Sequence, residues 1–361
     1  MTTSSRKLDH IRICLEKSVE TSPRPFDDLM LIHRALPEIS DSEIDTSFRF
    51  LGRKIKAPLM ITGMTGGHPE AREININLAV AAQEMGVALG LGSQRAALED
   101  PRQVETFSMV REVAPDVPIV GNIGAVQLRD SGSEVLDRLA EMIDADAMAV
   151  HLNFLQESVQ PEGDRDASGI LETIASACSS VPVIVKETGA GISGEVASEL
   201  LEAGVKIIDV SGVGGTSWST VEAFRAEEAG DKESLNLGRI FKSWGIPTPV
   251  SVVECASTGA EVISSGGVRN GIDVAKSLAL GASMAGMALP MLAPASRGPR
   301  DVEKAIKECI SALRMSMFLT GCRDLSKLRS AQVVILGRTR EILEQRGFDI
   351  RKFSIYKEMA R

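Results

Sequence analysis

The chain contains 361 residues with a net charge of −9, and only 4% of its residues are aromatic. This acidic balance is unlike the basic footprint of a nucleic-acid-binding protein, and no apolar run approaches the roughly 18 residues that cross a membrane. The cysteines are scattered without close spacing, at positions 14, 178, 255, 309 and 322. Such spacing favours reduced thiols in a cytoplasmic protein over disulfides or zinc ligands. We also expect no signal peptide, because the N-terminal residues lack an apolar core.

Residues 1–55 are expected to form an extension that precedes the main fold. The extension begins with a basic cluster in the segment RKLDH, formed by Arg6, Lys7 and His10. Chain ends are usually poorly ordered, so the chemistry of these residues alone favours a solvated tail. The alternation within residues 39–58 predicts a β-hairpin ahead of the first strand of the main fold.

Residues 56–292 repeat one pattern, a short apolar run that ends in Gly or a polar residue. The eight runs are residues 57–63, 87–93, 117–122, 147–153, 181–187, 205–212, 261–267 and 284–290. Continuous apolar runs of this length are typical of strands buried on both faces of a parallel sheet. Helical patterns lie between them, for example at residues 134–143 and 192–204. Eight strand–helix units predict an α/β fold, a TIM (β/α)8 barrel with its chemistry at the carboxyl ends of the strands.

The longest gap between runs lies before the seventh, and its residues 221–245 are expected to be charged and exposed. Residues 248–256 could be a ninth strand, but we interpret them as a helix, with Thr248 as the N-cap and Pro249 in the first helical position. After the barrel, residues 301–321 have apolar side chains at helical spacing and end in Gly. We therefore expect helices over residues 293–361, and a single domain over residues 1–361.

A lysine interrupts the fifth run, where Lys186 is expected near the end of a central strand. A buried ammonium group costs free energy unless it meets an anion or loses its charge. Three interpretations stay open for this residue. The side chain could reach solvent, it could balance the charge of an anionic cofactor, or it could form a Schiff base.

The ends of several other runs predict a large, flat, phosphorylated ligand. The loops after the seventh and eighth strands of a barrel commonly bind phosphate, and here Gly266 and Gly267 would offer backbone N–H groups beside the charge of Arg269. The sixth run ends in the glycine-rich segment SGVGGTSW, a second loop of this kind. The first run ends in ITGMTGG, where glycine would let a flat ring approach the backbone. Asn122, at the end of the third run, can both donate and accept hydrogen bonds.

The fourth run ends in the polar segment HLNFLQE. His151 and Asn153 alternate to one face of a strand, and Gln156 and Glu157 follow in the loop. A single carboxylate among amides could bind Mg²⁺ if a diphosphate supplied further oxygen ligands. A zinc site is disfavoured, because no second His or Cys stands at ligand spacing.

These motifs together resemble type 2 isopentenyl-diphosphate isomerase, the FMN-dependent form, over nearly the whole chain. The matching segments, in order, are RKLDH, TGMTGG, LGSQRA, GNIGA, HLNFLQE, VKETGAG, SGVGGTSW, SGGVRNG and GMALP. RKLDH and HLNFLQE are specific to this family. VKE, the SGG–Arg segment and the glycine at the end of the first run are shared with other FMN barrels such as 2-hydroxy-acid oxidases.

The resemblance implies a flavin across the barrel mouth and a substrate beside it. The implied contacts of the flavin ring are Thr62, Gly63, Met64, Ser93, Asn122 and Lys186. The implied contacts of its ribityl chain and phosphate are Ser211, Thr216, Gly267, Val268, Arg269, Ala288 and Leu289. The implied substrate contacts are Arg6, Lys7, Ser93, Gln94, Arg95, His151, Asn153 and Gln156. Glu157 matches the Mg²⁺ ligand, and the implied catalytic residues are Gln156 and Glu222.

The reaction implied is the reversible isomerisation of isopentenyl diphosphate to dimethylallyl diphosphate, a step of isoprenoid biosynthesis. One proton is added at the terminal alkene carbon and another is removed from the allylic carbon. Reduced FMN would serve as acid and base, Mg²⁺ would bind the diphosphate, and NADPH would only reduce the flavin. We expect a homo-oligomer, a tetramer or an octamer, in the cytoplasm.

Three alternatives remain. An FMN-dependent 2-hydroxy-acid oxidase would need a His–Arg pair for its substrate carboxylate, but none of the four histidines follows the sixth run. A Schiff-base aldolase would use Lys186 and carry no flavin. A non-enzymatic binding or assembly barrel would not need polar residues at so many strand ends.

Overall fold

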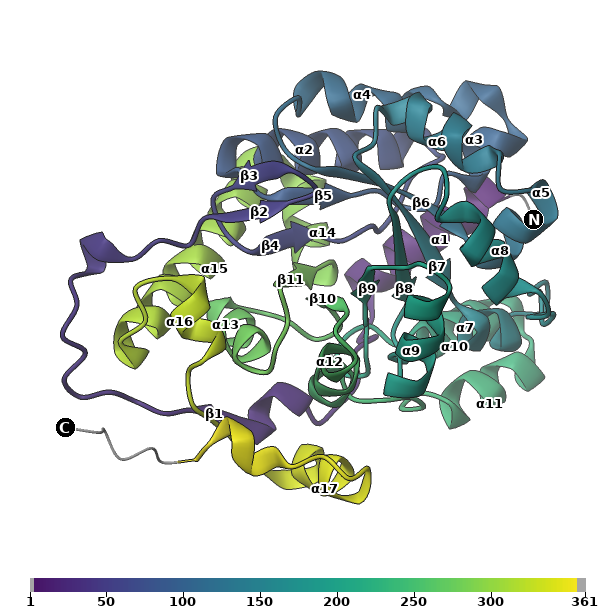
Figure 1. Cartoon of the computed structure of the whole chain (residues 1–361). Helices are drawn as coiled ribbons and strands as arrows, with labels where there is room; N and C mark the ends of the chain where they lie inside the picture. Colours follow the sequence, from purple (N-terminus) through teal and green to yellow (C-terminus); the bar gives the residue numbers. More distant parts are fainter. Residues whose placement is uncertain (1–2, 356–361) are drawn as a thin grey trace.

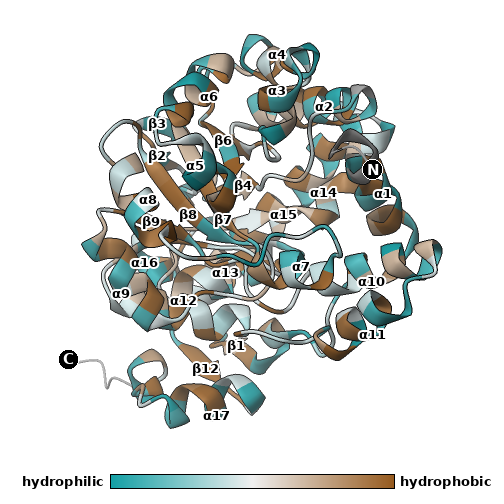
Figure 2. Ribbon diagram, turned by 90° about the vertical axis from the view of Figure 1, so that its right-hand side faces the viewer, coloured by the Kyte–Doolittle hydropathy of each residue, from teal (hydrophilic) through white to brown (hydrophobic). Residues whose placement is uncertain are grey.

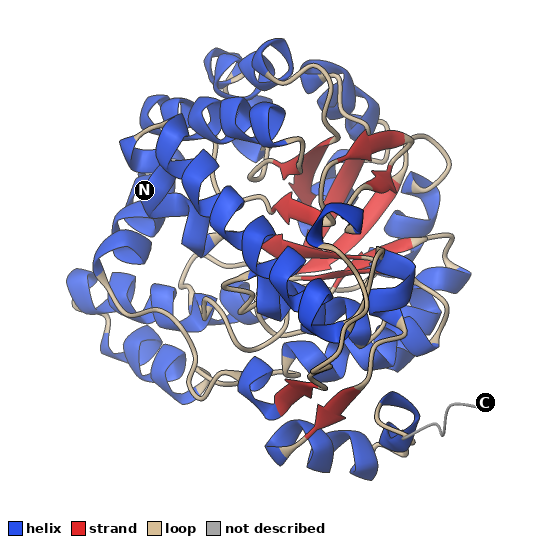
Figure 3. Ribbon diagram, turned by 90° about the vertical axis from the view of Figure 1, so that its left-hand side faces the viewer, coloured by secondary structure: helices blue, strands red, loops and turns tan. Residues whose placement is uncertain are grey.

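The computed structural model describes the backbone of residues 3–355 and the side chains of residues 7–68 and 70–355. Its centre is a closed barrel of eight parallel strands, in the order β10-β11-β4-β5-β6-β7-β8-β9. The strands are β4 (Leu59–Ile61), β5 (Ala88–Gly90), β6 (Ile119–Gly124), β7 (Ala147–Leu152), β8 (Val183–Glu187), β9 (Ile207–Asp209), β10 (Glu261–Ser264) and β11 (Met284–Met287). Seven predicted runs each contain one strand, and the third overlaps β6, which continues two residues further to Gly124, so the predicted TIM barrel is confirmed. Figure 3 shows the strands enclosed by helices.

Helices cover the outside of the barrel and bury their apolar faces against it. The covering helices include α2 (Pro69–Met85), α4 (Glu105–Val113), α6 (Val135–Ile143), α8 (Ile170–Ala177), α9 (Gly194–Glu202), α12 (Thr248–Ser257), α13 (Gly271–Ala279) and α15 (Pro299–Thr320). In α6, the buried side chains Leu136, Leu139, Ala140 and Ile143 recur every three or four residues, which is the spacing of one helix face. Figure 2 shows apolar strands at the centre, within helices of mixed hydropathy.

The barrel is filled by its own side chains and closed at one end. The predicted hairpin is confirmed as β2 (Phe48–Phe50) and β3 (Arg53–Ile55), which pair antiparallel. Its buried residues Phe50 and Ile55 pack in one cluster with interior residues such as Met60 and Ile184. The hairpin therefore forms the floor at the amino ends of the strands, and polar side chains gather at the opposite rim.

Helix α12 confirms the predicted helix but corrects its start. Pro247 is the N-cap, Thr248 is the first helical residue, and Pro249 follows it. The Thr248 hydroxyl does not cap the helix, because it donates a hydrogen bond to the backbone oxygen of Gly266 at 2.6 Å. Thr248, which was expected to cap the helix, thus connects α12 by a hydrogen bond to the loop that follows β10.

The region between the sixth and seventh strands differs from the expected exposed stretch. It forms two helices, α10 (Trp218–Ala229) and α11 (Lys232–Ile240). Val221, Glu222 and Ala223 are buried on α10. The N-terminal helix α1 (Thr3–Glu16) covers these residues of α10, and its fully buried Ile13 packs in one cluster with Val221. The N-terminal segment is therefore a docked helix and not a solvated tail.

The two terminal extensions meet outside the barrel. Helix α15 ends at Gly321 in the left-handed conformation, as expected. Beyond it lie α16 (Leu325–Arg329), the unpredicted strand β12 (Val333–Ile335) and α17 (Gly337–Gln345). Strand β12 pairs antiparallel with β1 (Leu29–Leu31), so these two segments of the N-terminal and C-terminal extensions lie side by side (Figure 1).

Four short 3₁₀ segments and four further helices complete the described chain. These are η1 (Pro25–Asp28), η2 (Asp41–Glu43), η3 (Pro101–Gln103), η4 (Ile350–Phe353), α3 (Arg95–Glu99), α5 (Ala125–Ser131), α7 (Phe154–Val159) and α14 (Leu289–Arg297). Among the described residues, none of the helices combines the length and the apolar character needed to cross a membrane.

The floor of the barrel gives a stability prediction. Phe50→Ala removes a side chain that is 1% exposed, so we expect the free energy of unfolding to fall by ~3–5 kcal/mol, the usual cost of truncating a buried aromatic residue. Arg49→Ala in the same strand changes an exposed side chain and is the matched control. Urea denaturation of the two variants measures the difference, and equal midpoints would contradict the assigned floor.

Candidate functional site

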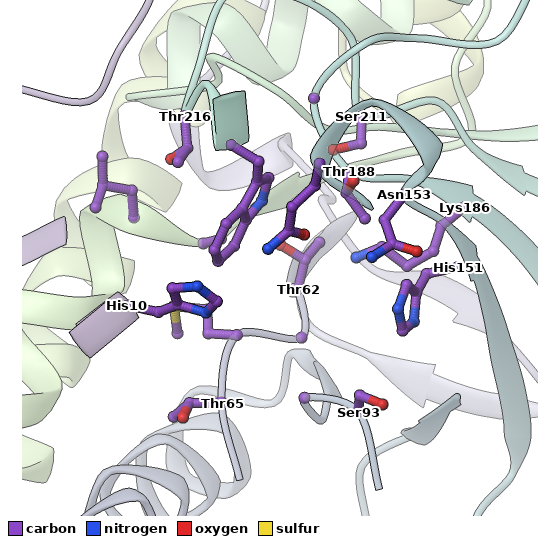
Figure 4. A pocket seen from close by; sticks show the side chains of 18 of the residues that line it. His10, Thr62, Thr65, Ser93, His151, Asn153, Lys186, Thr188, Ser211 and Thr216 are labelled. Carbon is purple, nitrogen blue, oxygen red and sulfur yellow. The ribbon is translucent and has the colours of Figure 1, made fainter. Parts of the chain in front are cut away.

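One cavity opens at the carboxyl ends of the barrel strands and draws together residues from all eight of them. The predicted site residues that line it are Lys7, Thr62, Gly63, Met64, Ser93, Arg95, Asn122, His151, Asn153, Gln156, Glu157, Lys186, Ser211, Thr216, Gly267, Arg269, Ala288 and Leu289. Figure 4 shows His151, Asn153 and Lys186 near one another, with His10 approaching from helix α1. The sequence motifs therefore converge on one site.

Four predicted residues are placed differently. Gln94 is fully buried behind the wall, where its amide donates to the Leu139 backbone oxygen at 2.9 Å and accepts from the Asn122 N–H at 3.0 Å. The side chain of Val268 is buried in the core. Glu222 lies directly behind Gln156 and is 2% exposed. Arg6 belongs to α1, but its side chain lies outside the described residues.

The wall formed by the loops after β9 and β10 has the chemistry of a phosphate site. Gly266 and Gly267 adopt φ values of +92° and +90°, and a Cβ added at Gly267 would lie 2.4 Å from the Gly214 oxygen. Within the described part of the chain, the N–H groups of Gly266, Gly267 and Val268 donate to no other protein group. Consecutive unpaired amides of this kind form an anion-binding concavity. Arg269, ion-paired with Glu20, adds positive charge beside them.

A buried ion pair lies at the bottom of the cavity. The Nζ atom of Lys186 is 4.0 Å from a carboxylate oxygen of Asp209, and Ser265 donates to the other oxygen at 2.5 Å. Burial raises the pKa of Asp209, while the Lys186 charge and the Ser265 hydrogen bond oppose that rise. The arrangement holds a cation at the cavity floor, where an anionic ring system would need one.

The ring tautomer of His151 follows from its neighbour. The Asn122 amide nitrogen donates to the Leu91 backbone oxygen at 3.0 Å, so its oxygen must accept from Nδ1–H of His151, 2.9 Å away. Burial, with the charges of Lys186 and Lys7, lowers the pKa of His151 to about 3. His151 is therefore neutral, and its Nε2 is the nitrogen without a proton.

Glu157 presents a carboxylate that is already well supported. Its two oxygens accept from Asn153 Nδ2 at 2.8 Å, Gln160 Nε2 at 2.7 Å and the Asp164 N–H at 3.0 Å. A carboxylate has about four acceptor positions, so these bonds leave room for one further partner such as a metal ion. Among the described residues, no three His, Cys, Asp or Glu side chains cluster as metal ligands. A cation here would need most of its ligands from a bound anion or water.

A second buried carboxylate supports the cavity wall from behind. The Oε1 atom of Glu222 accepts from Gln156 Nε2 at 2.7 Å and lies 2.9 Å from His10 Nε2, while Oε2 pairs with Arg225. Burial alone would raise the pKa of Glu222, but the hydrogen bond and charge of His10, with the charge of Arg225, bring it to about 2. Glu222 is therefore ionised at neutral pH.

Helix α1 contributes cationic and aromatic contacts at the cavity mouth. Lys7 donates to the Ser93 backbone oxygen at 2.7 Å, and its Nζ atom is 5.5 Å from the centre of the Phe107 ring. Arg95, at the start of α3, donates to Glu99 at 2.6 Å. These two cations and neutral His151 belong to the wall across the barrel from the glycine loops.

Sequence reasoning missed several site residues, and some left a signal. Asp209 lies within the run VKIIDVSG and ends strand β9, where an acidic residue in a buried strand beside a lysine-bearing strand is a cue. Thr188 and Gly189 line the cavity directly after Lys186. Trp218 lines it from α10 and meets His10 edge-on, with ring centres 5.1 Å apart, a contact that sequence spacing alone does not reveal.

Comparison with known proteins agrees with this geometry. The FMN-dependent dehydrogenase family model matches residues 14–109 and 138–335. The isopentenyl-diphosphate delta-isomerase of Methanothrix thermoacetophila is 63% identical over 98% of this chain and 99% of its own. The protein of the same name from Methanococcoides burtonii is 51% identical over 99% and 100%.

Solved structures share the fold at much lower identity. A mandelate oxidase variant with benzaldehyde superposes with a TM-score of 0.64 at 18% identity, over 93% of this chain and 99% of its own. At that identity the likeness concerns the barrel and not the reaction. The match to the isomerases spans nearly all residues of both chains. The protein therefore belongs to the isopentenyl-diphosphate delta-isomerase family and has the FMN-dependent dehydrogenase fold.

Proposed function

We propose that this protein interconverts isopentenyl diphosphate and dimethylallyl diphosphate with reduced FMN bound across the barrel mouth. One observation carries the proposal, namely that a single cavity has anion-binding groups on two opposed walls. The glycine loop with Arg269 follows β10, whereas Arg95 follows β5 on the other side of the closed ring, and Lys7 reaches the same side through Ser93. One wall suits the phosphate of FMN and the other suits a diphosphate substrate.

The isomerisation adds a proton at the terminal alkene carbon and removes one from the allylic carbon, without net oxidation. When bound, reduced FMN supplies a ring nitrogen that can act as acid and base beside a hydrocarbon. Lys186, which lines the cavity and pairs with Asp209, would balance the negative charge of the reduced ring. Gln156 lines the cavity with Glu222 behind it, and we propose that this pair acts at the reacting end of the substrate.

The remaining polar groups would fix the substrate in position. Lys7 and Arg95 supply positive charge at the mouth, where a diphosphate would bind. Glu157 would hold Mg²⁺ together with diphosphate oxygens, in keeping with the preference of this cation for oxygen ligands and retained waters. Binding energy from the diphosphate, which is remote from the reacting carbons, would keep the hydrocarbon in register.

Further features belong to the proposal. Reduced flavin needs an electron donor, for which we propose NADPH. The five cysteines, none paired, support a reducing compartment, the cytoplasm. Large apolar side chains exposed on and near α11, Ile240 at 66% and Trp244 at 63%, support a homo-oligomer, a tetramer or an octamer.

The direct test is turnover. We expect the FMN-loaded chain, reduced with dithionite and supplied with Mg²⁺, to convert isopentenyl diphosphate into its allylic isomer. The same protein with oxidised flavin is the control and should be inactive. Product analysis by NMR measures the outcome. In a parallel assay with NADPH in place of dithionite, consumption of one NADPH per product would instead indicate a reductase.

The phosphate wall gives a second prediction. Arg269→Ala should weaken FMN binding by ~1.5–3 kcal/mol, the range for a hydrogen bond to a charged group. Arg129→Ala, which changes a cation outside the cavity, is the matched control. Titration of the apoprotein with FMN, followed by flavin fluorescence, compares them. An unchanged dissociation constant in the Arg269 variant would remove this residue from the phosphate site.

The metal proposal gives a third prediction. Glu157→Gln keeps the shape of the side chain but removes its charge, so we expect a higher Mg²⁺ requirement or a loss of turnover, with an unaltered flavin spectrum. Glu172→Gln on α8, distant from the cavity lining, is the control. Activity measured across an Mg²⁺ titration should separate the two variants. If both have the parent's Mg²⁺ dependence, Glu157 is not the ligand.

A further inference from the structure

Histidine 10 stands at the junction of the N-terminal helix and the cavity. Its Nε2 atom lies 2.9 Å from Glu222 Oε1, and its ring packs edge-on against Trp218 at an interplanar angle of 71°. His10 lines the cavity, and Figure 4 shows its ring entering from α1. The side chain thus connects a helix outside the barrel with the carboxylate behind Gln156.

Glu222 is surrounded by donors from three elements. His10 comes from α1, Gln156 from α7, and Arg225 from α10 itself. Cys14 of α1 also faces it, but burial raises the pKa of that thiol to about 12, so it stays neutral. Glu162, beyond α7, pairs with Arg225 at 3.0 Å. Without His10, Gln156 would be the remaining partner of the Glu222 Oε1 atom among the described side chains.

The ionised state of Glu222 decides how the Gln156 amide is turned. A carboxylate without a proton only accepts hydrogen bonds, so Gln156 must direct its NH₂ group towards Glu222. The carbonyl oxygen of Gln156 is then the end available to the cavity. A protonated Glu222 could donate instead, and the amide could turn over and present its NH₂ group to the substrate.

Lys7 and His10 lie three residues apart on α1, so they project from one face of the helix. Lys7 reaches the rim at Ser93 while His10 reaches Glu222. Both contacts require α1 to be docked across the mouth. Helix α1 therefore carries both Lys7, a proposed diphosphate contact, and His10, a hydrogen-bond partner of Glu222.

We propose that His10 is a positioning residue for the isomerisation, because its hydrogen bond to Glu222 holds the Gln156 carbonyl towards the substrate once α1 is docked. This inference rests on the proposed function. It separates two roles on one helix: Lys7 contributes to substrate affinity, and His10 contributes to turnover of the bound substrate.

The test compares His10→Ala and His10→Gln in the full-length, FMN-loaded protein, with Arg12→Ala as the matched control. Arg12 connects α1 to α10, because its Nη1 atom donates a hydrogen bond to Glu228 Oε1 at 3.0 Å. Arg12 does not line the cavity. We expect His10→Ala to lower kcat about tenfold or more, with KM within about twofold of the parent. Arg12→Ala should keep the parent values, and Lys7→Ala should mainly raise KM.

A pH profile distinguishes this role from simple packing. His10 contributes most to holding the pKa of Glu222 low, so removal of His10 should raise the pKa of Glu222. Activity is lost as pH falls through the pKa of a required carboxylate. The acid limb of kcat should therefore move to higher pH. His10→Gln can still donate to Glu222 but cannot carry a charge. It should recover most of kcat at neutral pH and keep part of the shift in the acid limb.

Three results would overturn the inference. The first is a His10→Ala variant that loses no more kcat than Arg12→Ala. The second is a change confined to KM. The third is a His10→Gln variant that loses kcat but keeps the pH profile of the parent. This third result can be obtained even if His10→Ala does not load FMN. A parent chain without isomerase activity would overturn the proposed function, and this inference with it.

Discussion

The hydrogen-bonded closure of β4 onto β11 is the constraint on which the site depends. Leu59, Met60 and Ile61 pair with Ala285, Gly286 and Met287, and this pairing turns eight strands into a ring. All carboxyl ends then share one rim, while the hairpin residue Phe50 fills the opposite end. Polar residues that are far apart in sequence can therefore face one another only at that rim. The cavity is a consequence of ring closure and needs no separate domain.

This acidic chain forms an anion-binding cavity in two ways: the buried carboxylates around the cavity accept hydrogen bonds from neighbouring side chains, and cationic side chains line the cavity. Asp209, Glu157 and Glu222 each accept hydrogen bonds from side chains fixed by the fold. Lys186 and Arg269 face the cavity within those surroundings. His151 remains neutral because its burial next to cations disfavours a further charge. Cationic side chains are thus gathered at the cavity although the net charge of the chain is −9.

Sequence reasoning was strongest where a pattern extends over many residues. The barrel runs were recognisable because burial on both faces leaves few polar positions in a strand, and those lie near its carboxyl end. Strands β1 and β12 escaped notice because each is a three-residue strand that lies outside the repeated series of barrel runs. Thr248 was misassigned because its hydroxyl bonds a carbonyl outside its own helix. Residue chemistry placed His151, Asn153 and Glu157 together, but the partners of Glu222 come from separate elements and only the folded chain brings them together.

The order of the strands also governs how this protein can be made. During synthesis β4 to β9 can pair as each emerges, but the free edge of β4 must wait for β11, and β1 must wait for β12 near the other end of the chain. An open parallel sheet exposes unpaired backbone groups and apolar faces that invite association with other chains. The barrel therefore cannot become a ring until β11 (Met284–Met287) of the 361-residue chain has left the ribosome. For most of its translation a growing chain of this fold therefore exposes unpaired strand edges and apolar faces.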